Sequence, residues 1–255
     1  MFFPLSDDDR HLLKPAYVSI TLLVINLLLF AYQYVNPAFT TGWSVVPWEI
    51  TKGVDLVGPV MVGEGEGQFA IEHVAGPSPI YLTLLSSMFM HGGLAHLGGN
   101  MLFLWIFGDN VEHRFGAVLF LVFYLLSGFV ATAAQVFLGP ESVIPNLGAS
   151  GAISGVLGAY LVLFPRNKVN AVFFFRMISV PAVVVLGMWI AMQLFQGYGS
   201  LSSIGESGGV AYAAHIGGFV AGVVAGFFAR VWMKEEPSSV IREQYRRDAN
   251  ARQYW

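Results

Sequence analysis

Long apolar runs alternate with short polar segments along most of the chain. A helix that crosses the ~30 Å hydrocarbon core of a bilayer needs about 20 mostly apolar residues. Runs of this kind predict six transmembrane helices, over residues 16–35, 82–108, 115–138, 150–164, 177–195 and 210–233. The second run is interrupted by His91-Gly92-Gly93, and residues 36–79 contain no membrane-length run. The pattern therefore predicts a six-helix bundle with a long loop after its first helix.

The composition supports an all-α, polytopic membrane protein. Hydrophobic residues make up 55% of the 255-residue chain, charged residues 11%, and the mean hydropathy is +0.62. Soluble domains carry about 25% charged residues. The chain has no cysteine, which excludes disulfides and thiolate metal sites. No small-residue cleavage site follows the first apolar run, so we expect a retained anchor rather than a signal peptide.

The positions of the basic residues predict the orientation in the membrane. Six spans place both termini on one side, and the segments on that side hold every Lys and Arg except Lys52. Because cytoplasmic segments are enriched in Lys and Arg, we expect both termini in the cytoplasm and loop 36–79 outside. The expected organisation is a cytoplasmic N-terminus at 1–15, a six-helix membrane domain at 16–233 and a charged cytoplasmic tail at 234–255. The acidic residues of the outer loop are expected to solvate it: Glu49, Asp55, Glu64, Glu66 and Glu72.

Four polar side chains interrupt the apolar runs at similar predicted depths. With this topology the second, fourth and sixth helices all enter the bilayer from the outer face. At ~1.5 Å per helical residue, Ser150 and His215 each lie ~22 Å from the cytoplasmic boundary of their helix. His96 lies at ~20 Å and Asn100 at ~14 Å by the same measure. All four therefore fall in one zone of the outer half of the bilayer.

Each of these residues alone has an ordinary structural explanation. A lone serine in a membrane helix usually donates a hydrogen bond to the carbonyl four residues earlier in its own helix. A buried histidine can make a structural hydrogen bond to a neighbouring helix. Asn100 alone could hold two helices together. The agreement in depth and sidedness across all four favours a shared site.

Glycines predict which helices meet at that site. The fourth and sixth predicted helices each carry glycines at three- or four-residue spacing. These are Gly151, Gly155 and Gly158, and Gly218, Gly222 and Gly226. Such stripes let membrane helices approach closely. His215 precedes Gly218 by three residues and shares its helix face, so contact between the stripes would bring His215 against Ser150.

The remaining polar residues restrict the chemistry. The sequence has no H-E-x-x-H metalloprotease motif, its lysines lie outside the predicted spans, and Asp109 and Glu112 lie at a cytoplasmic edge. What remains is a serine activated by an imidazole. No acid is placed to orient His215, so we expect a dyad and a slow enzyme, since removing the orienting acid from a triad costs about 10⁴ in rate. His96, Asn100 and the Ser150 N–H are candidate donors to an oxyanion.

These residues resemble the motifs of the rhomboid intramembrane serine proteases. The matching segments are Gly148-Ala149-Ser150-Gly151 for G-x-S-G, His91, His96 and Asn100 for H-x₄-H-x₃-N, and Ala214-His215, Gly218 and Gly222 for A-H-x-x-G-x-x-x-G. Residues 108–116 resemble the family's G-x₃-E-x-R-x-G. The resemblance implies a Ser150 nucleophile, a His215 general base, and oxyanion stabilisation by His96, Asn100 and the Ser150 amide.

The resemblance also implies an endopeptidase that cleaves in or next to transmembrane segments, near the outer face, through an acyl-enzyme. The implied partners are transmembrane protein substrates and the lipid bilayer, with no nucleic acid, cofactor or metal ion. We expect a multi-pass protein of a bacterial plasma membrane. Two features depart from well-studied members: Ser154 replaces a tyrosine that stacks on the histidine, and residues 80–90 lack a Trp-Arg pair. Phe or Trp neighbours are expected to hold His215 instead.

Two other functions remain open. A non-catalytic relative would bind membrane clients for quality control without cleaving them, although both Ser150 and His215 are present. A channel or transporter with a polar midplane site would move solute, but the predicted spans lack the buried acid that proton-coupled transport usually uses. The protease is the favoured hypothesis.

Overall fold

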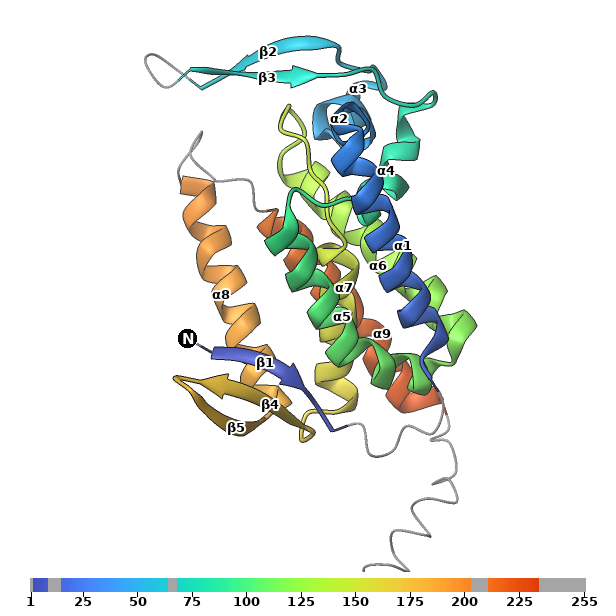
Figure 1. The fold of residues 1–255 in the computed structure, drawn as a ribbon, viewed down its shortest axis with the longest axis vertical. Coiled ribbons are helices and arrows are strands. Elements are labelled where there is room, and N and C mark those ends of the chain that lie inside the picture. Colours follow the sequence, from blue (N-terminus) through green and yellow to red (C-terminus); the bar gives the residue numbers. More distant parts are fainter. Residues whose placement is uncertain (1, 9–14, 64–67, 203–210, 234–255) are drawn as a thin grey trace, which may run out of the picture.

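The described chain is mostly helical, and its long helices pack into a bundle (Figure 1). The computed structural model describes residues 2–8, 15–63, 68–202 and 211–233. The bundle consists of α1 (Tyr17–Val35), α5 (Leu94–Phe115), α6 (Ala117–Leu138), α7 (Ser150–Leu163), α8 (Ala182–Ser202) and α9 (Tyr212–Trp232). Each predicted apolar run therefore contains a helix.

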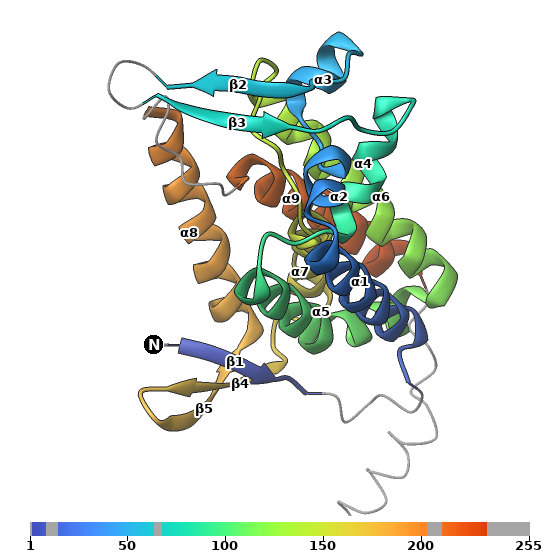
Figure 2. The same cartoon turned by 45° about the horizontal axis from the view of Figure 1, so that its top comes forward.

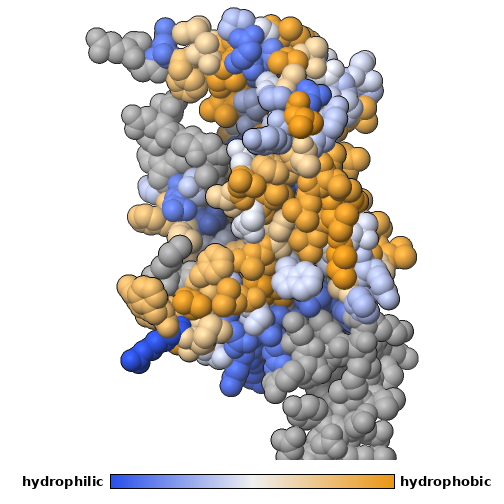
Figure 3. All heavy atoms as spheres, viewed as in Figure 1, coloured by the Kyte–Doolittle hydropathy of each residue, from blue (hydrophilic) through white to orange (hydrophobic). Residues whose placement is uncertain are grey.

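Three of these helices have the length and composition of membrane spans. α1, α6 and α9 are long and apolar enough to cross a membrane, whereas α7 and the apolar part of α8 are shorter. Large apolar side chains are exposed on the bundle, among them Leu28 at 66% and Phe137 at 82%. Hydrophobic side chains cover much of the helical flank in Figure 3. An apolar surface of this extent fits lipid rather than water.

Two helices begin later than predicted. The second run opens with 3₁₀ turns at Ile80–Leu82 and Ser87–Phe89 on either side of α4 (Thr83–Ser86), and α5 begins only at Leu94. Gly92 and Gly93 account for the break, because glycine is a poor helix former. The fifth run opens with the strand β5 (Arg176–Pro181), and α8 follows it. A short apolar run does not by itself distinguish a strand from a helix.

The fold is not all-α, because a small antiparallel sheet lies at each end of the bundle. β1 (Phe2–Ser6), β4 (Lys168–Phe173) and β5 form one sheet in the order β1-β4-β5. β2 (Gly58–Val62) and β3 (Phe69–His73) form a hairpin at the opposite end (Figures 1 and 2). Segment 1–15, predicted as a polar N-terminus, thus contains a strand whose partner lies between α7 and α8.

α7 is the centre of the bundle, and its contact with α9 is made by glycines. Residues 151–160 of α7 are all buried. A Cβ added to Gly218 would overlap the carbonyl oxygen of Gly151, and one added to Gly222 would overlap that of Gly155. The two backbones therefore touch, as the glycine spacing predicted.

The loop after α1 holds the segment that leads into α7. Its helices are α2 (Pro37–Trp43) and α3 (Pro47–Lys52). Val45 and Asn146 exchange two backbone hydrogen bonds, of 3.0 and 2.7 Å. The expectation that acidic residues only solvate this loop is wrong for Glu49 and Asp55. Glu49 is 4% exposed, accepts the Leu56 N–H at 3.0 Å and has a pKa raised by burial, and Asp55 accepts the Gly76 N–H. Glu72 is exposed, and Glu64 and Glu66 lie outside the described residues.

The last turn of α5 caps the ends of two other helices. The Glu112 carboxylate accepts the Val18 and Ser19 N–H groups at 2.9 and 2.7 Å, at the start of α1. Arg114 donates to the Ala229 and Met233 carbonyls at 3.1 Å, at the end of α9. A carboxylate at a helix N-terminus and a guanidinium at a C-terminus both complement the helix dipole. This segment therefore fixes α1 and α9 relative to α5.

Candidate active site

The side chains of Ser150 and His215 meet between α7 and α9. Ser150 is the first residue of α7, and His215 lies in the first turn of α9. The distance from Ser150 Oγ to His215 Nε2 is 2.8 Å, within hydrogen-bond range. The serine hydroxyl can therefore donate to the ring nitrogen that would take its proton.

The other ring nitrogen of His215 is held by a residue that the sequence analysis missed. His215 Nδ1 lies 2.7 Å from Gln193 Oε1, and Gln193 is 6% exposed on α8. An amide oxygen only accepts, so Nδ1 carries the proton and Nε2 is left free to accept from Ser150. The sequence does mark Gln193 as an amide within an apolar run. It does not show that the Gln193 side chain points toward His215.

Aromatic rings flank His215 where the usual tyrosine is absent. The Trp189 ring lies 6.0 Å from the His215 ring, centroid to centroid, at an interplanar angle of 40°, and Tyr212 lies 6.5 Å away. Trp189 precedes Gln193 by four residues, so both project from one face of α8. Ser154 is buried and donates to the Ser150 carbonyl at 2.6 Å. Trp189 of α8 and Tyr212 of α9 therefore pack around His215.

His96 and Asn100 of α5 line the same cavity as Ser150 and His215. The cavity has a volume of about 360 Å³, and its remaining walls are largely apolar. The apolar side chains include Phe103, Ile153, Leu157 and Trp189. A space of this size can admit a ligand beside the serine.

Two hydrogen-bond donors on α5 are free to serve a ligand in this cavity. Asn100 is 7% exposed, and its Nδ2 has no hydrogen-bond partner within the described part of the chain. His96 Nδ1 accepts the Gly92 N–H at 3.4 Å, which leaves the ring proton on Nε2. A Cβ added to Gly148 would lie 2.8 Å from His96 Nε2, and Gly148 has a φ of +134°. Glycine is therefore needed there for both space and conformation.

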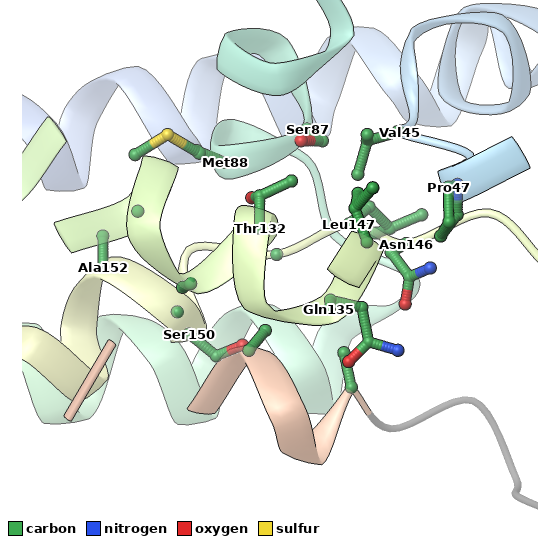
Figure 4. Close-up of a pocket in the computed structure, with 17 residues that line it drawn as sticks. Val45, Pro47, Ser87, Met88, Thr132, Gln135, Asn146, Leu147, Ser150 and Ala152 are labelled. Carbon is green, nitrogen blue, oxygen red and sulfur yellow. The ribbon is translucent and has the colours of Figure 1, made fainter. Parts of the chain in front are cut away.

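A smaller pocket adjoins Ser150 on the side of α6. Its volume is about 40 Å³, and the polar side chains of Ser87, Thr132, Gln135 and Asn146 line it (Figure 4). Gln135 Oε1 is buried without a partner among the residues described. The pocket is large enough for water.

The rhomboid domain model matches residues 79–231, more than half of the chain. The chain belongs to the rhomboid family. Among curated relatives, it is 32% identical to the mitochondrial rhomboid protein 1 of Saccharomyces cerevisiae over 178 residues, which cover 68% of this chain and 47% of the relative. It is 37% identical to the rhomboid protease GluP of Bacillus subtilis over 146 residues, 57% and 25% of the two chains. It is 31% identical to the human presenilin-associated rhomboid-like protein, mitochondrial, over 172 residues, 64% and 42%.

Membership of the rhomboid family makes this a membrane protein, but leaves the membrane undetermined. The chain spans less than half the length of these relatives. Two of them are mitochondrial by name, and the third is from a bacterium. A bacterial plasma membrane therefore stays a prediction. All four candidate site residues lie inside the matched rhomboid domain, as does Gln193.

Proposed function

We propose that this rhomboid protein is a serine endopeptidase that hydrolyses peptide bonds in or next to transmembrane segments of other proteins. The observation that carries the proposal is the hydrogen-bonded chain from Ser150 through His215 to Gln193, with distances of 2.8 and 2.7 Å. A nucleophile, a base and a group that orients the base are the parts that nucleophilic catalysis requires.

In the proposed first step Ser150 Oγ attacks the substrate carbonyl carbon while His215 Nε2 takes the hydroxyl proton. The carbonyl oxygen becomes an oxyanion, which Asn100 Nδ2, His96 Nε2 and the Ser150 N–H stabilise. Ser150 starts α7, where backbone N–H groups lack intrahelical acceptors. The tetrahedral intermediate then collapses, and His215 gives its proton to the departing amine.

In the second step water replaces the amine. His215 takes a proton from the water, which attacks the Ser150 ester, and the acid product leaves as the serine regains its proton. Gln193 holds the imidazole in the required tautomer throughout, but as a neutral amide it does not balance the imidazolium charge as an aspartate would. A slow enzyme is expected for that reason.

The proposal extends to topology. Six spans with both termini in the cytoplasm would place the Ser150 end of α7 toward the outer face. Loop 36–79 would then lie outside and the β1-β4-β5 sheet inside. Substrates would reach Ser150 from the membrane or its outer surface as locally unwound segments.

The test is cleavage of a single-span protein in liposomes by purified variants. Ser150→Ala and His215→Ala are each expected to lower kcat by at least about 10³-fold, because the nucleophile and its base act as a unit. Ser179→Ala, exposed on β5 and outside the cavity, is the control and is expected to keep its activity. Fluorophosphonate labelling of the wild type at Ser150 is the second readout. Undiminished cleavage by either variant would contradict the proposal, and absent labelling together with client binding would favour the non-catalytic alternative.

A further inference from the structure

The hairpin between α7 and α8 ends in an exposed cluster of phenylalanines. Phe173 closes β4 opposite Arg176 at the start of β5, so Phe174 and Phe175 form a two-residue turn. The exposed fractions of Phe173, Phe174 and Phe175 are 44%, 66% and 100%. Among the described residues nothing covers the Phe175 ring, and Phe173 and Phe174 pack edge to face with centroids 4.8 Å apart.

The backbone of the turn is unfavourable for the residues it holds. Phe174 has a φ of 48° and Phe175 a φ of 83°. Two-residue turns with both φ values positive are usually built from Asn-Gly or similar pairs. A bulky side chain in this region is a conformational outlier. Local strain that persists in a folded protein points to a function for the strained residues.

The hairpin is fastened to the helices at its base and projects at its tip. Ala182 N–H donates to Asn167 O at 2.8 Å, Val183 N–H donates to Pro165 O at 3.1 Å, and Val169 and Ala171 are buried. Figures 1 and 2 show the strands crossing the end of the bundle and the turn extending beyond α8. The tip therefore lies level with the end of α7 and the start of α8. This level is the edge of the exposed apolar surface of the helix bundle.

Basic residues accompany the aromatic tip. Arg166, Lys168 and Arg176 are exposed, and the sequence from 161 to 181 contains no acidic residue. Figure 3 shows hydrophobic side chains gathered at the hairpin with hydrophilic ones beside them. Aromatic rings settle at the boundary between headgroups and acyl chains, and Lys and Arg are attracted to anionic lipid.

We propose that the β4–β5 turn is a lipid anchor. Phe174 and Phe175 insert into the headgroup–acyl boundary of the adjacent leaflet, and Arg176 binds the phosphate of an anionic phospholipid. The anchor holds the ends of α7 and α8 at a fixed depth. The turn lies at the other end of α7 from Ser150, so the anchor does not depend on the proposed catalysis.

The test uses the absence of native cysteine, since one introduced thiol carries the only label. Phe175→Cys carries a nitroxide at the tip. Ser179→Cys, exposed on β5 near the base of the hairpin, is the matched control. In vesicles of phosphatidylcholine and phosphatidylglycerol, the label at 175 is expected to be accessible to oxygen and shielded from a water-soluble nickel chelate. The label at 179 should show the opposite pattern.

Two outcomes would overturn the proposal. The first is equal accessibility of the labels at 175 and 179 to the nickel chelate. The second is shielding of the label at 175 from both reagents, because a protein partner or a second copy would then cover the tip.

A second variant separates lipid binding from folding. Replacing Phe174→Asn and Phe175→Gly together supplies the residues that the turn prefers, so the melting temperature in detergent should be unchanged or higher. Phosphatidylglycerol should raise the melting temperature of the wild type more than that of this variant or of Arg176→Gln. An equal rise in all three proteins would contradict the anchor.

Discussion

α9 and α8 both reach the candidate site beside α7, but they are held there in different ways. α9 touches α7 through backbone, because an added Cβ at Gly218 or Gly222 would overlap a carbonyl oxygen of α7. α8 reaches the site through the side chains of Trp189 and Gln193. Along residues 191–198 of α8, only Gln193 and Gly197 are buried. The position of α9 is therefore set by direct backbone contact. α8 packs into the apolar core at its start, through Ala182, Val185 and Leu186, and a few polar and aromatic contacts hold the part of it that reaches the site.

The difference predicts two kinds of sensitivity. Where backbones touch, any added atom must push the helices apart, because packed interiors have no spare volume. Where side chains meet, a substitution can change the chemistry of His215 and leave the fold intact. Variants on the two helices should consequently separate loss of structure from loss of rate.

The largest effect is expected for Gly222→Ala. The new methyl group would overlap the Gly155 carbonyl oxygen, so α9 would move away from α7 and carry His215 away from Ser150. We expect destabilisation of about 1–3 kcal/mol or more, as for other overpacked cores, and loss of detectable cleavage. Thermal unfolding in detergent and the liposome assay measure the two effects. A variant that keeps both its melting temperature and its activity would show that the two backbones are not in rigid contact.

The glycine contact was predictable from the sequence, whereas the role of α8 was not. Spacing along one helix identifies a face, so Gly218, Gly222 and His215 could be assigned to the same side of α9. The contact of Gln193 with His215 depends on the rotation of α8 about its axis, which packing decides. The early part of the fifth run was wrongly predicted as helix because β5 is stabilised by β4, and β1 was missed because its partner is distant in sequence. Long-range pairing of this kind leaves little local signal.

The second prediction concerns the hydrogen bond from His215 to Gln193. Gln193→Leu leaves the half-buried Nδ1–H of His215 without its acceptor, which costs up to about 1–3 kcal/mol. If that loss falls on the transition state, kcat drops by about 10- to 100-fold, with KM changed by less than about twofold. Gln193→Glu restores an acceptor oxygen and should recover part of the rate. A fall in melting temperature with kcat unchanged would indicate that Gln193 only stabilises the fold.

A smaller effect is expected from the ring that packs beside His215. Trp189→Leu removes an aromatic neighbour worth about 0.5–1.5 kcal/mol, so cleavage should slow by about 2- to 10-fold. Trp189→Phe keeps a ring in place and should stay closer to the wild type. Both kcat and KM should be measured, because Trp189 also lines the cavity beside Ser150. Equal rates for all three proteins would mean that Gln193 alone orients the histidine.

The smallest effect is expected for Gly187→Ala, the counterpart on α8 of the change at Gly222. A Cβ at Gly187 would meet no atom within 4 Å, so the substitution adds a methyl group without a clash. Alanine is the better helix former by about 0.8–1.0 kcal/mol, so the melting temperature should be equal or slightly higher. Cleavage should be unchanged, because Gln193 and Trp189 keep their places. A loss of stability and of cleavage as large as that expected for Gly222→Ala would show that α8 is packed as tightly as α9. The contrast between the two helices would then be wrong.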